Sequence, residues 1–196
     1  MVLASGSPRR LQLLAQIGVT PDAVCPVAVP EEPAAGERPR DCARRLARDK
    51  ARAVPPDPGD LVLAADTVVA AGRRILGKPS DASEARRMLQ MLSGRRHRVL
   101  TGVALRSATR DWLRVVETVV AMKRISSAEL DAFIQSEDWR DKAGGYAIQG
   151  LAAVLVKRIN GSYSNVVGLP LAETAALLAS AGYRILPEPA AARPRS

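Results

Sequence analysis

The chain has 196 residues, of which 47% are apolar and 25% are charged, and its net charge is +9. These proportions are typical of a globular protein and exclude a fully disordered chain. The longest apolar run, 151–156, is far shorter than the roughly 18 residues of a membrane span, so we expect no membrane partner. The basic charge attracts polyanions. Because the arginine pairs are scattered and only 3% of the residues are aromatic, a small phosphorylated ligand is favoured over nucleic acid as the main partner.

In the first half of the chain, strand and helix signals follow one another closely. A strand stub over 1–4 leads into a helix over 8–17, with Ser7 as the N-cap and Pro8 in the first helical position. The segment 19–40 is rich in proline and is expected to be extended. We then expect, in order, a helix over 41–53 that turns Lys50 inward, a short strand over 61–65, a hairpin over 68–77 and a helix over 83–92.

The second half of the chain predicts two long antiparallel strands that pair with each other. Residues 99–105 and 113–121 alternate apolar with polar side chains on either side of a polar turn. Ser126 and Glu129 form a capping box that opens a helix to about 135. We expect a strand over 152–159, a short return strand over 163–167 and a last helix over 170–180. Strands and helices are mixed without strict alternation, which favours an α/β fold with a mixed sheet.

The length is that of one domain, which we predict over 1–186, followed by a disordered Pro/Ala/Arg-rich tail at 187–196. No basic segment precedes an apolar one near the first residue, so we expect no signal peptide and a cytoplasmic location. Cys25 and Cys42 are too few for a disulfide framework or a zinc site and are expected to be buried or half-buried thiols. His97 is the one histidine, which argues against a Ser-His-Asp triad.

The turn at residues 5–7 has the chemistry of a phosphate cradle. Backbone N–H groups and the positive end of the helix dipole point at it, the hydroxyls of Ser5 and Ser7 add donors, and Arg9 and Arg10 add positive charge. The alternative is a plain capped helix with arginines on its surface.

Three later positions carry further candidate side chains. Asp66 ends an apolar strand, where a carboxylate can bind a metal or act as a base, although it can equally cap a turn. Lys78 lies between Gly77 and Pro79, which can aim its ammonium group or simply form a surface turn. Gln149 follows a glycine pair and offers a donor and an acceptor to a base edge, unless the segment is a surface loop. Together these residues suit a nucleotide.

Seven segments follow one another in a recognisable order: Leu3-Ala-Ser-Gly-Ser-Pro-Arg-Arg10, Arg45-Leu-Ala-x-x-Lys50-Ala51, Ala65-Asp-Thr67, Leu76-Gly-Lys-Pro79, Met88-Leu-x-x-Leu-Ser-Gly94, Lys142-Ala-Gly-x-Tyr-Ala-Ile-Gln-Gly150 and Val167-Gly-Leu-Pro170. Over residues 3–182 they resemble the Maf family, first described as septum formation inhibitors and now regarded as nucleoside triphosphate pyrophosphatases. The resemblance implies a mixed, twisted sheet with flanking helices and a cleft between two lobes, similar to inosine triphosphate pyrophosphatases. It also implies hydrolysis of a nucleoside triphosphate to the monophosphate and pyrophosphate, a divalent cation (Mg²⁺ or Mn²⁺) and a possible homodimer.

The family's site residues transfer to matching positions. Asp66 matches the catalytic acid, described as a proton acceptor, and also a metal ligand. The family's metal-binding glutamate corresponds by spacing to Glu31 rather than Glu32, although the acidic residue that often precedes it is Pro30 here. The substrate-binding positions correspond to Ser5, Ser7, Arg10, Lys50 and Lys78.

The resemblance also bears on the base. One subfamily acts on dTTP and UTP and another on 7-methyl-GTP, and the three positions that separate them are here Arg9, Thr67 and Gln149. The 7-methyl-GTP type carries tryptophan, glutamine and glutamate there, which attract a positively charged base. Arg9 repels such a base, whereas the Gln149 amide suits the acceptor–donor–acceptor edge of uracil or thymine. The expectation is therefore a dTTP/UTP pyrophosphatase, with a 7-methyl-GTP pyrophosphatase and a nucleotide-binding regulator of cell division as alternatives.

Overall fold

A computed structural model describes residues 1–185. The strands in this range form one sheet in the order β2-β1-β3-β5-β6-β7, with β4 beside β3. They are β1 (Val2–Leu3), β2 (Ala23–Val24), β3 (Val62–Ala71), β4 (Arg74–Leu76), β5 (Arg96–Arg106), β6 (Asp111–Met122) and β7 (Val156–Asn160). β1 is parallel to β2 and β3, and the other pairs are antiparallel. The predicted mixed sheet is confirmed.

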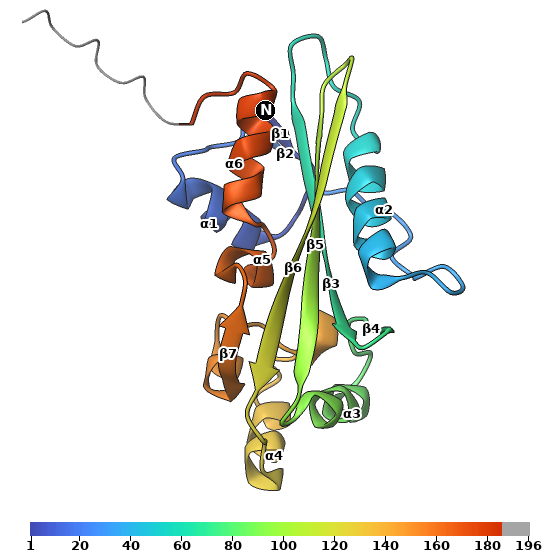
Figure 1. Ribbon diagram of the computed structural model, residues 1–196, viewed down its shortest axis with the longest axis vertical. Coiled ribbons are helices and arrows are strands. Elements are labelled where there is room, and N and C mark those ends of the chain that lie inside the picture. Colours follow the sequence, from blue (N-terminus) through green and yellow to red (C-terminus); the bar gives the residue numbers. More distant parts are fainter. Residues whose placement is uncertain (186–196) are drawn as a thin grey trace, which may run out of the picture.

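Helices flank the long strands β3, β5 and β6 on both faces (Figure 1). α2 covers one face, α1, α5 and α6 lie on the other, and α3 and α4 pack at one end. The helices are α1 (Pro8–Gln16), α2 (Pro39–Arg52), α3 (Ala82–Leu92), α4 (Ser127–Gln135), α5 (Tyr163–Val167) and α6 (Leu171–Ser180), with 3-10 turns η1 (Ala143–Gly145) and η2 (Leu151–Leu155). The α/β fold class with flanking helices is confirmed.

β3 changes its outer neighbour halfway along its length. Val62 and Leu63 pair with β1, whereas β4 begins its pairing opposite Val69. Between them, residues 64–68 have no strand beside their outer edge in the described chain, although β5 pairs with all of them on the inner side. The outer edge of the sheet therefore parts at this point, while the pairing of β3 with β5 continues without a break.

The predicted end of a strand before Asp66 is wrong, because β3 runs without interruption from Val62 to Ala71. The apolar residues that follow Asp66 and Thr67 continue the pairing with β5, so the two polar residues are carried in mid-strand. The expected hairpin is confirmed as the pairing of the end of β3 with β4.

Of the two strands expected near the end of the chain, the one over 152–159 is wrong in part and the one over 163–167 is wrong. Residues 151–155 form η2, and only Val156–Asn160 is a strand. Ala152 and Leu155 are the buried positions, and a spacing of three suits a 3-10 turn rather than a strand. Residues 163–167 form α5 instead of a return strand, because the Ser162 hydroxyl accepts a hydrogen bond from the Asn165 N–H and caps one helical turn.

The five predicted longer helices are confirmed, with small differences at their ends. α4 has the predicted capping box between Ser126 and Glu129. α1 begins after Ser7 as expected, but the Ser7 side chain makes no capping hydrogen bond. α2 begins at Pro39, ahead of the expected start, because proline is well suited to a first helical position.

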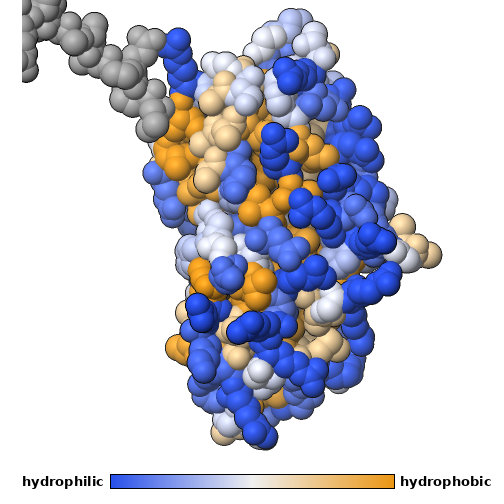
Figure 2. Space-filling view, viewed as in Figure 1, coloured by the Kyte–Doolittle hydropathy of each residue, from blue (hydrophilic) through white to orange (hydrophobic). Residues whose placement is uncertain are grey.

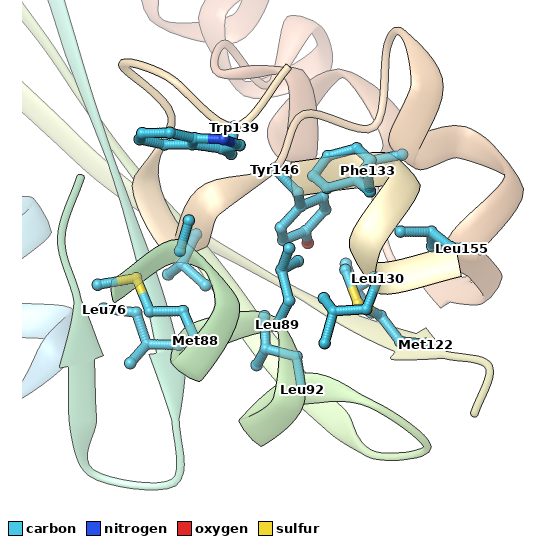
Figure 3. Packing of buried hydrophobic residues seen from close by; sticks show 14 of the residues in the cluster. Leu76, Met88, Leu89, Leu92, Met122, Leu130, Phe133, Trp139, Tyr146 and Leu155 are labelled. Atoms are coloured by element: carbon cyan, nitrogen blue, oxygen red, sulfur yellow. The ribbon is translucent and has the colours of Figure 1, made fainter. Parts of the chain in front are cut away.

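A cluster of apolar side chains at one end of the sheet holds the segment after α4. Figure 3 shows Trp139, Phe133 and Tyr146 gathered with Leu89 in this cluster. All of these side chains are buried, and burial of each aromatic side chain contributes about 2 kcal/mol or more to stability. The cluster therefore anchors the chain on either side of η1.

The surface is mostly polar. Figure 2 shows hydrophilic side chains over most of one face, with apolar side chains gathered along β6. Half-buried Leu113, Val115 and Val116 belong to that strand. Within residues 1–185 no helix has the length and apolar character needed to cross a membrane. The single domain predicted over 1–186 stays a prediction, and the tail expected at 187–196 lies outside the described residues.

Candidate active site

The parting of the sheet opens into a cleft of about 850 Å³. The turn after β1 forms one wall, the end of β4 and the residues after it form another, and mid-β3 forms the floor. The cleft brings together every site residue predicted from the sequence, namely Ser5, Ser7, Arg9, Arg10, Glu31, Lys50, Asp66, Thr67, Lys78 and Gln149. The expected cleft is thus present.

A chain of alternating charges crosses the cleft. Lys50 Nζ donates to Asp66 Oδ1 at 2.5 Å and to Glu31 Oε1 at 2.7 Å, and Lys78 Nζ donates to Glu31 Oε2 at 3.2 Å. Partial burial opposes ionisation of Glu31, but its hydrogen bonds to the two lysines lower the pKa of the carboxyl below its ordinary value. Glu31, rather than Glu32, presents its carboxylate to the lysines.

Close packing of α2 on the sheet places Lys50 beside Asp66. Gly102 in β5 is paired with Asp66, and a Cβ atom at Gly102 would lie 2.1 Å from the backbone oxygen of Ala43 in α2. Only glycine allows this approach. Ala43 and Lys50 are both buried, as the inward face predicted from their seven-residue spacing requires.

Arg10 is buried beneath the turn at residues 5–7, which connects β1 to α1. Its guanidinium donates to Ser5 Oγ at 2.9 Å, to the backbone oxygen of Gly168 at 2.9 Å and to Thr67 Oγ1 at 3.4 Å. Burial lowers the pKa of Arg10 from its ordinary value, and the charge of Asp66 acts in the opposite direction. The fixed guanidinium and the N-terminus of α1 together make this wall attractive to anions.

The segment that carries Gln149 is hydrogen-bonded to the residues that follow β4, where Lys78 lies. The Gly144 N–H donates to the Gly77 oxygen at 2.9 Å, and Lys142 Nζ donates to Asp138 at 3.1 Å. Gly144 has a φ of +70° and lies so near Val69 that a Cβ atom would be 2.8 Å from that side chain. The glycine pair thus serves close packing, and the segment is not an independent surface loop.

Two basic residues in this wall were not predicted as site residues. Arg140 and Lys142 both line the cleft, and the Arg140 guanidinium lies over the Trp139 ring, 4.7 Å from its centroid. Lys142 belongs to one of the motifs quoted above, which is a usable signal. Arg140 has no such signal, because its place depends on Trp139 being buried.

The cysteines and the histidine take no part in the chain of charges formed by Lys78, Glu31, Lys50 and Asp66, although Cys42 also lines the cleft. Cys42 is buried, and burial raises the pKa of its thiol to about 11. Cys25 is exposed, so the expectation of a buried or half-buried thiol is wrong there, because the extended segment at 25–37 is largely exposed to solvent. His97 is buried and contacts the Tyr146 hydroxyl at 2.6 Å, which agrees with the argument against a Ser-His-Asp triad.

A mixed sheet that parts over a buried carboxylate–lysine pair, beside an anion-attracting helix terminus, defines a class of proteins with a phosphate-binding cleft. Comparison with known proteins identifies the family. The model of the Maf-like protein family matches residues 1–181, and the chain belongs to this family.

Similar proteins from bacteria cover nearly the whole chain. A protein of Roseobacter denitrificans is 60% identical over 93% of this chain and 97% of its own length. One of Rhodospirillum rubrum is 57% identical over 94% of this chain and 89% of its own length. One of Brucella abortus is 51% identical, with 94% and 93% covered. Each of these relatives is named dTTP/UTP pyrophosphatase.

Proposed function

We propose that this protein hydrolyses dTTP and UTP to the nucleoside monophosphate and pyrophosphate. The observation that carries the proposal is the cleft in which the Asp66 carboxylate lies within reach of Lys50, with Lys78 and Arg10 along the same walls. Such a set can bind a triphosphate and act on it. Relatives that are 51% to 60% identical bear the name of this activity.

In the proposed reaction, water attacks the α-phosphorus and pyrophosphate leaves. Asp66 orients the attacking water and accepts its proton. Lys50, Lys78 and Arg10 neutralise the charge of the triphosphate as the bond breaks. Because Glu31 engages both lysines, a triphosphate competes with this carboxylate for their ammonium groups.

Glu31 and Asp66 are the proposed ligands of a divalent cation, Mg²⁺ or Mn²⁺. Their carboxylates approach the same Lys50 ammonium group at 2.7 and 2.5 Å, which brings them close enough to share an ion. The described residues contain no cluster of three or more His, Cys, Asp or Glu. A pair of carboxylates completed by substrate phosphates is a usual arrangement for Mg²⁺. When bound, such an ion supplies Lewis acidity.

Arg9, Thr67 and Gln149 are the proposed base-selecting residues. All three line the cleft. Arg9 disfavours a cationic base such as 7-methylguanine, and the Gln149 amide offers both a donor and an acceptor to a pyrimidine edge. This chemistry supports dTTP and UTP, and related modified pyrimidine nucleotides whose removal prevents their incorporation into nucleic acid.

The proposal extends to the setting of the enzyme. We propose a cytoplasmic enzyme whose partner is the nucleotide, with residues 1–186 as one domain and a homodimer as its assembly. Sedimentation of the purified protein tests the dimer, since a single species at the monomer mass of 20.9 kDa would contradict it.

Pyrophosphate release by the purified protein tests the activity. The assay compares kcat/KM for dTTP, UTP, CTP and 7-methyl-GTP with Mg²⁺ or Mn²⁺. Asp66→Asn keeps the shape of the side chain and removes its charge, so turnover should fall by about three orders of magnitude or more. The proposal is contradicted if the enzyme prefers 7-methyl-GTP, if it releases free phosphate instead of pyrophosphate, or if Asp66→Asn keeps full activity. A nucleotide-binding regulator without hydrolysis would release no pyrophosphate.

A further inference from the structure

Behind Thr67, a line of hydrogen bonds runs from the floor of the cleft into the core. Thr67 in β3 and Thr101 in β5 are cross-strand partners, and their hydroxyl oxygens are 3.0 Å apart. Thr101 is fully buried, and its Oγ1 lies 3.0 Å from the backbone oxygen of Asn165. From the other side, Arg10 Nη2 approaches Thr67 Oγ1 at 3.4 Å.

The backbone oxygen of Asn165, at the end of the line, fixes the donor and the acceptor of every hydrogen bond in it. A carbonyl oxygen has no proton, so Thr101 must use its single hydroxyl proton on Asn165. Thr101 can then only accept from Thr67, which uses its own proton in that bond. Arg10 can only donate, so it takes one of the two lone pairs of Thr67. What Thr67 can still offer to the cleft is a lone pair and no proton.

We propose that Thr101 is a positioning residue that holds the Thr67 hydroxyl as a pure acceptor for an N–H donor of the substrate base. This proposal rests on the proposed function. Thr67 lines the cleft, and uracil and thymine carry one N–H donor at the imide position where cytosine carries a lone pair. The Thr67 hydroxyl and the Gln149 oxygen are both acceptors and can share this N–H in a three-centre hydrogen bond. A hydroxyl that cannot reverse its direction favours the imide, because the cytosine nitrogen would leave two lone pairs facing each other.

The test compares two substitutions of Thr101 by their effect on base choice. Thr101→Val keeps the shape and removes the hydroxyl, which frees the Thr67 proton to point into the cleft. The ratio of kcat/KM for UTP to that for CTP should fall roughly tenfold, the size of one hydrogen bond. Thr101→Ser keeps the hydroxyl and should retain the wild-type ratio of kcat/KM for UTP to that for CTP.

Thr118→Val is the matched control. Thr118 is also a buried threonine that bonds to Asn165, through the Asn165 side chain at 2.9 Å. Unlike Thr101, its hydroxyl bonds to Ser162 and Asn165 and not to Thr67. It should lower stability and leave the UTP to CTP ratio unchanged. If Thr101→Val lowers kcat/KM equally for both nucleotides, Thr101 has only a structural role and the proposal is overturned.

Two further measurements separate the remaining outcomes. If Thr101→Val changes the ratio of UTP to 2′-deoxy-UTP instead, the donor is a sugar hydroxyl and the assignment to the base is wrong. Neutron diffraction of the wild-type protein needs no variant, and the deuteron of Thr67 should lie toward Thr101; a deuteron directed into the cleft overturns the proposal. A wild-type protein inactive on both UTP and dTTP contradicts the proposed function, while the neutron result still decides the hydroxyl direction.

Discussion

Lys50 and Asp66 form a buried ion pair in which Lys50 has a second carboxylate partner, whereas Asp66 has no second cation partner in the described part of the chain. Lys50 Nζ pairs with both Asp66 and Glu31, whereas among residues 1–185 Asp66 pairs with Lys50 alone. The exposed fractions of the paired side chains are 10% for Lys50 and 12% for Asp66. Removing one partner of such a pair leaves the other charge buried without compensation. The loss in the free energy of unfolding therefore depends on which partner is removed.

We predict that Lys50→Met lowers the free energy of unfolding by about 3 kcal/mol at neutral pH, and that Asp66→Asn lowers it by less, because Lys50 then keeps Glu31. Urea unfolding of the two variants measures the difference. Arg52→Met is the control, since the Arg52–Asp111 pair is exposed and should contribute less than about 1 kcal/mol. Equal losses in the two buried variants would show that Glu31 does not support Lys50.

Gly102 offers a separate test of how the site is assembled. Gly102→Ala would place a Cβ atom 2.1 Å from the Ala43 oxygen, so α2 must move away from the sheet and carry Lys50 with it. We predict a loss of stability of about 3 kcal/mol, as for other overpacked sites, together with a large loss of activity. Gly77→Ala is a stability control, because no atom lies within 4 Å of the Cβ it would add. Wild-type unfolding of Gly102→Ala would refute the close-packing argument.

Much of the fold and of the site could be predicted because the signals are local. The seven-residue spacing of Ala43 and Lys50 is enough to turn the lysine inward. Two long strand-like segments joined by a polar turn are enough to pair β5 with β6. The family motifs then identify residues that the cleft brings together.

What the sequence does not reveal depends on tertiary contacts. That β3 continues past Asp66 depends on its pairing with β5 and on the buried Lys50. Short apolar segments such as 163–167 fit a strand and a helical turn equally well, and the Ser162 cap decides between them. The role of Thr101 follows from the direction of a hydrogen-bond line, which has no sequence signature.

The two cysteines should react at very different rates. Cys25 is exposed, whereas Cys42 is buried and has a pKa of about 11, so little of its reactive thiolate exists near pH 8. A thiol reagent should modify one cysteine quickly in the native protein and both after denaturation. Cys25→Ser should abolish the fast phase and Cys42→Ser should keep it. Rapid modification of both thiols in the native protein would show that Cys42 is accessible.

His97 should make the stability of the protein fall in mild acid. Burial lowers the pKa of His97 from 6.5 to about 4 in the folded protein. Between these values the unfolded chain binds a proton that the folded protein does not, so the free energy of unfolding decreases as the pH falls from about 6.5 to 4. Below pH 4 this group adds no further change. The contribution lost is at most about 3 kcal/mol, since each pKa unit corresponds to about 1.4 kcal/mol.

Urea unfolding at pH 7 and at pH 5 measures this effect, with His97→Gln as the comparison. Glutamine keeps a polar group beside the Tyr146 hydroxyl, which His97 contacts at 2.6 Å, but it does not titrate. The variant should be less stable than the wild type at pH 7, because the edge-to-face packing of His97 on Tyr146 is lost. Its stability should nevertheless change less between pH 7 and pH 5, since the carboxylates common to both proteins contribute equally. If both proteins lose the same free energy over this interval, His97 does not carry the acid sensitivity, and its pKa in the folded protein lies near that of the unfolded chain.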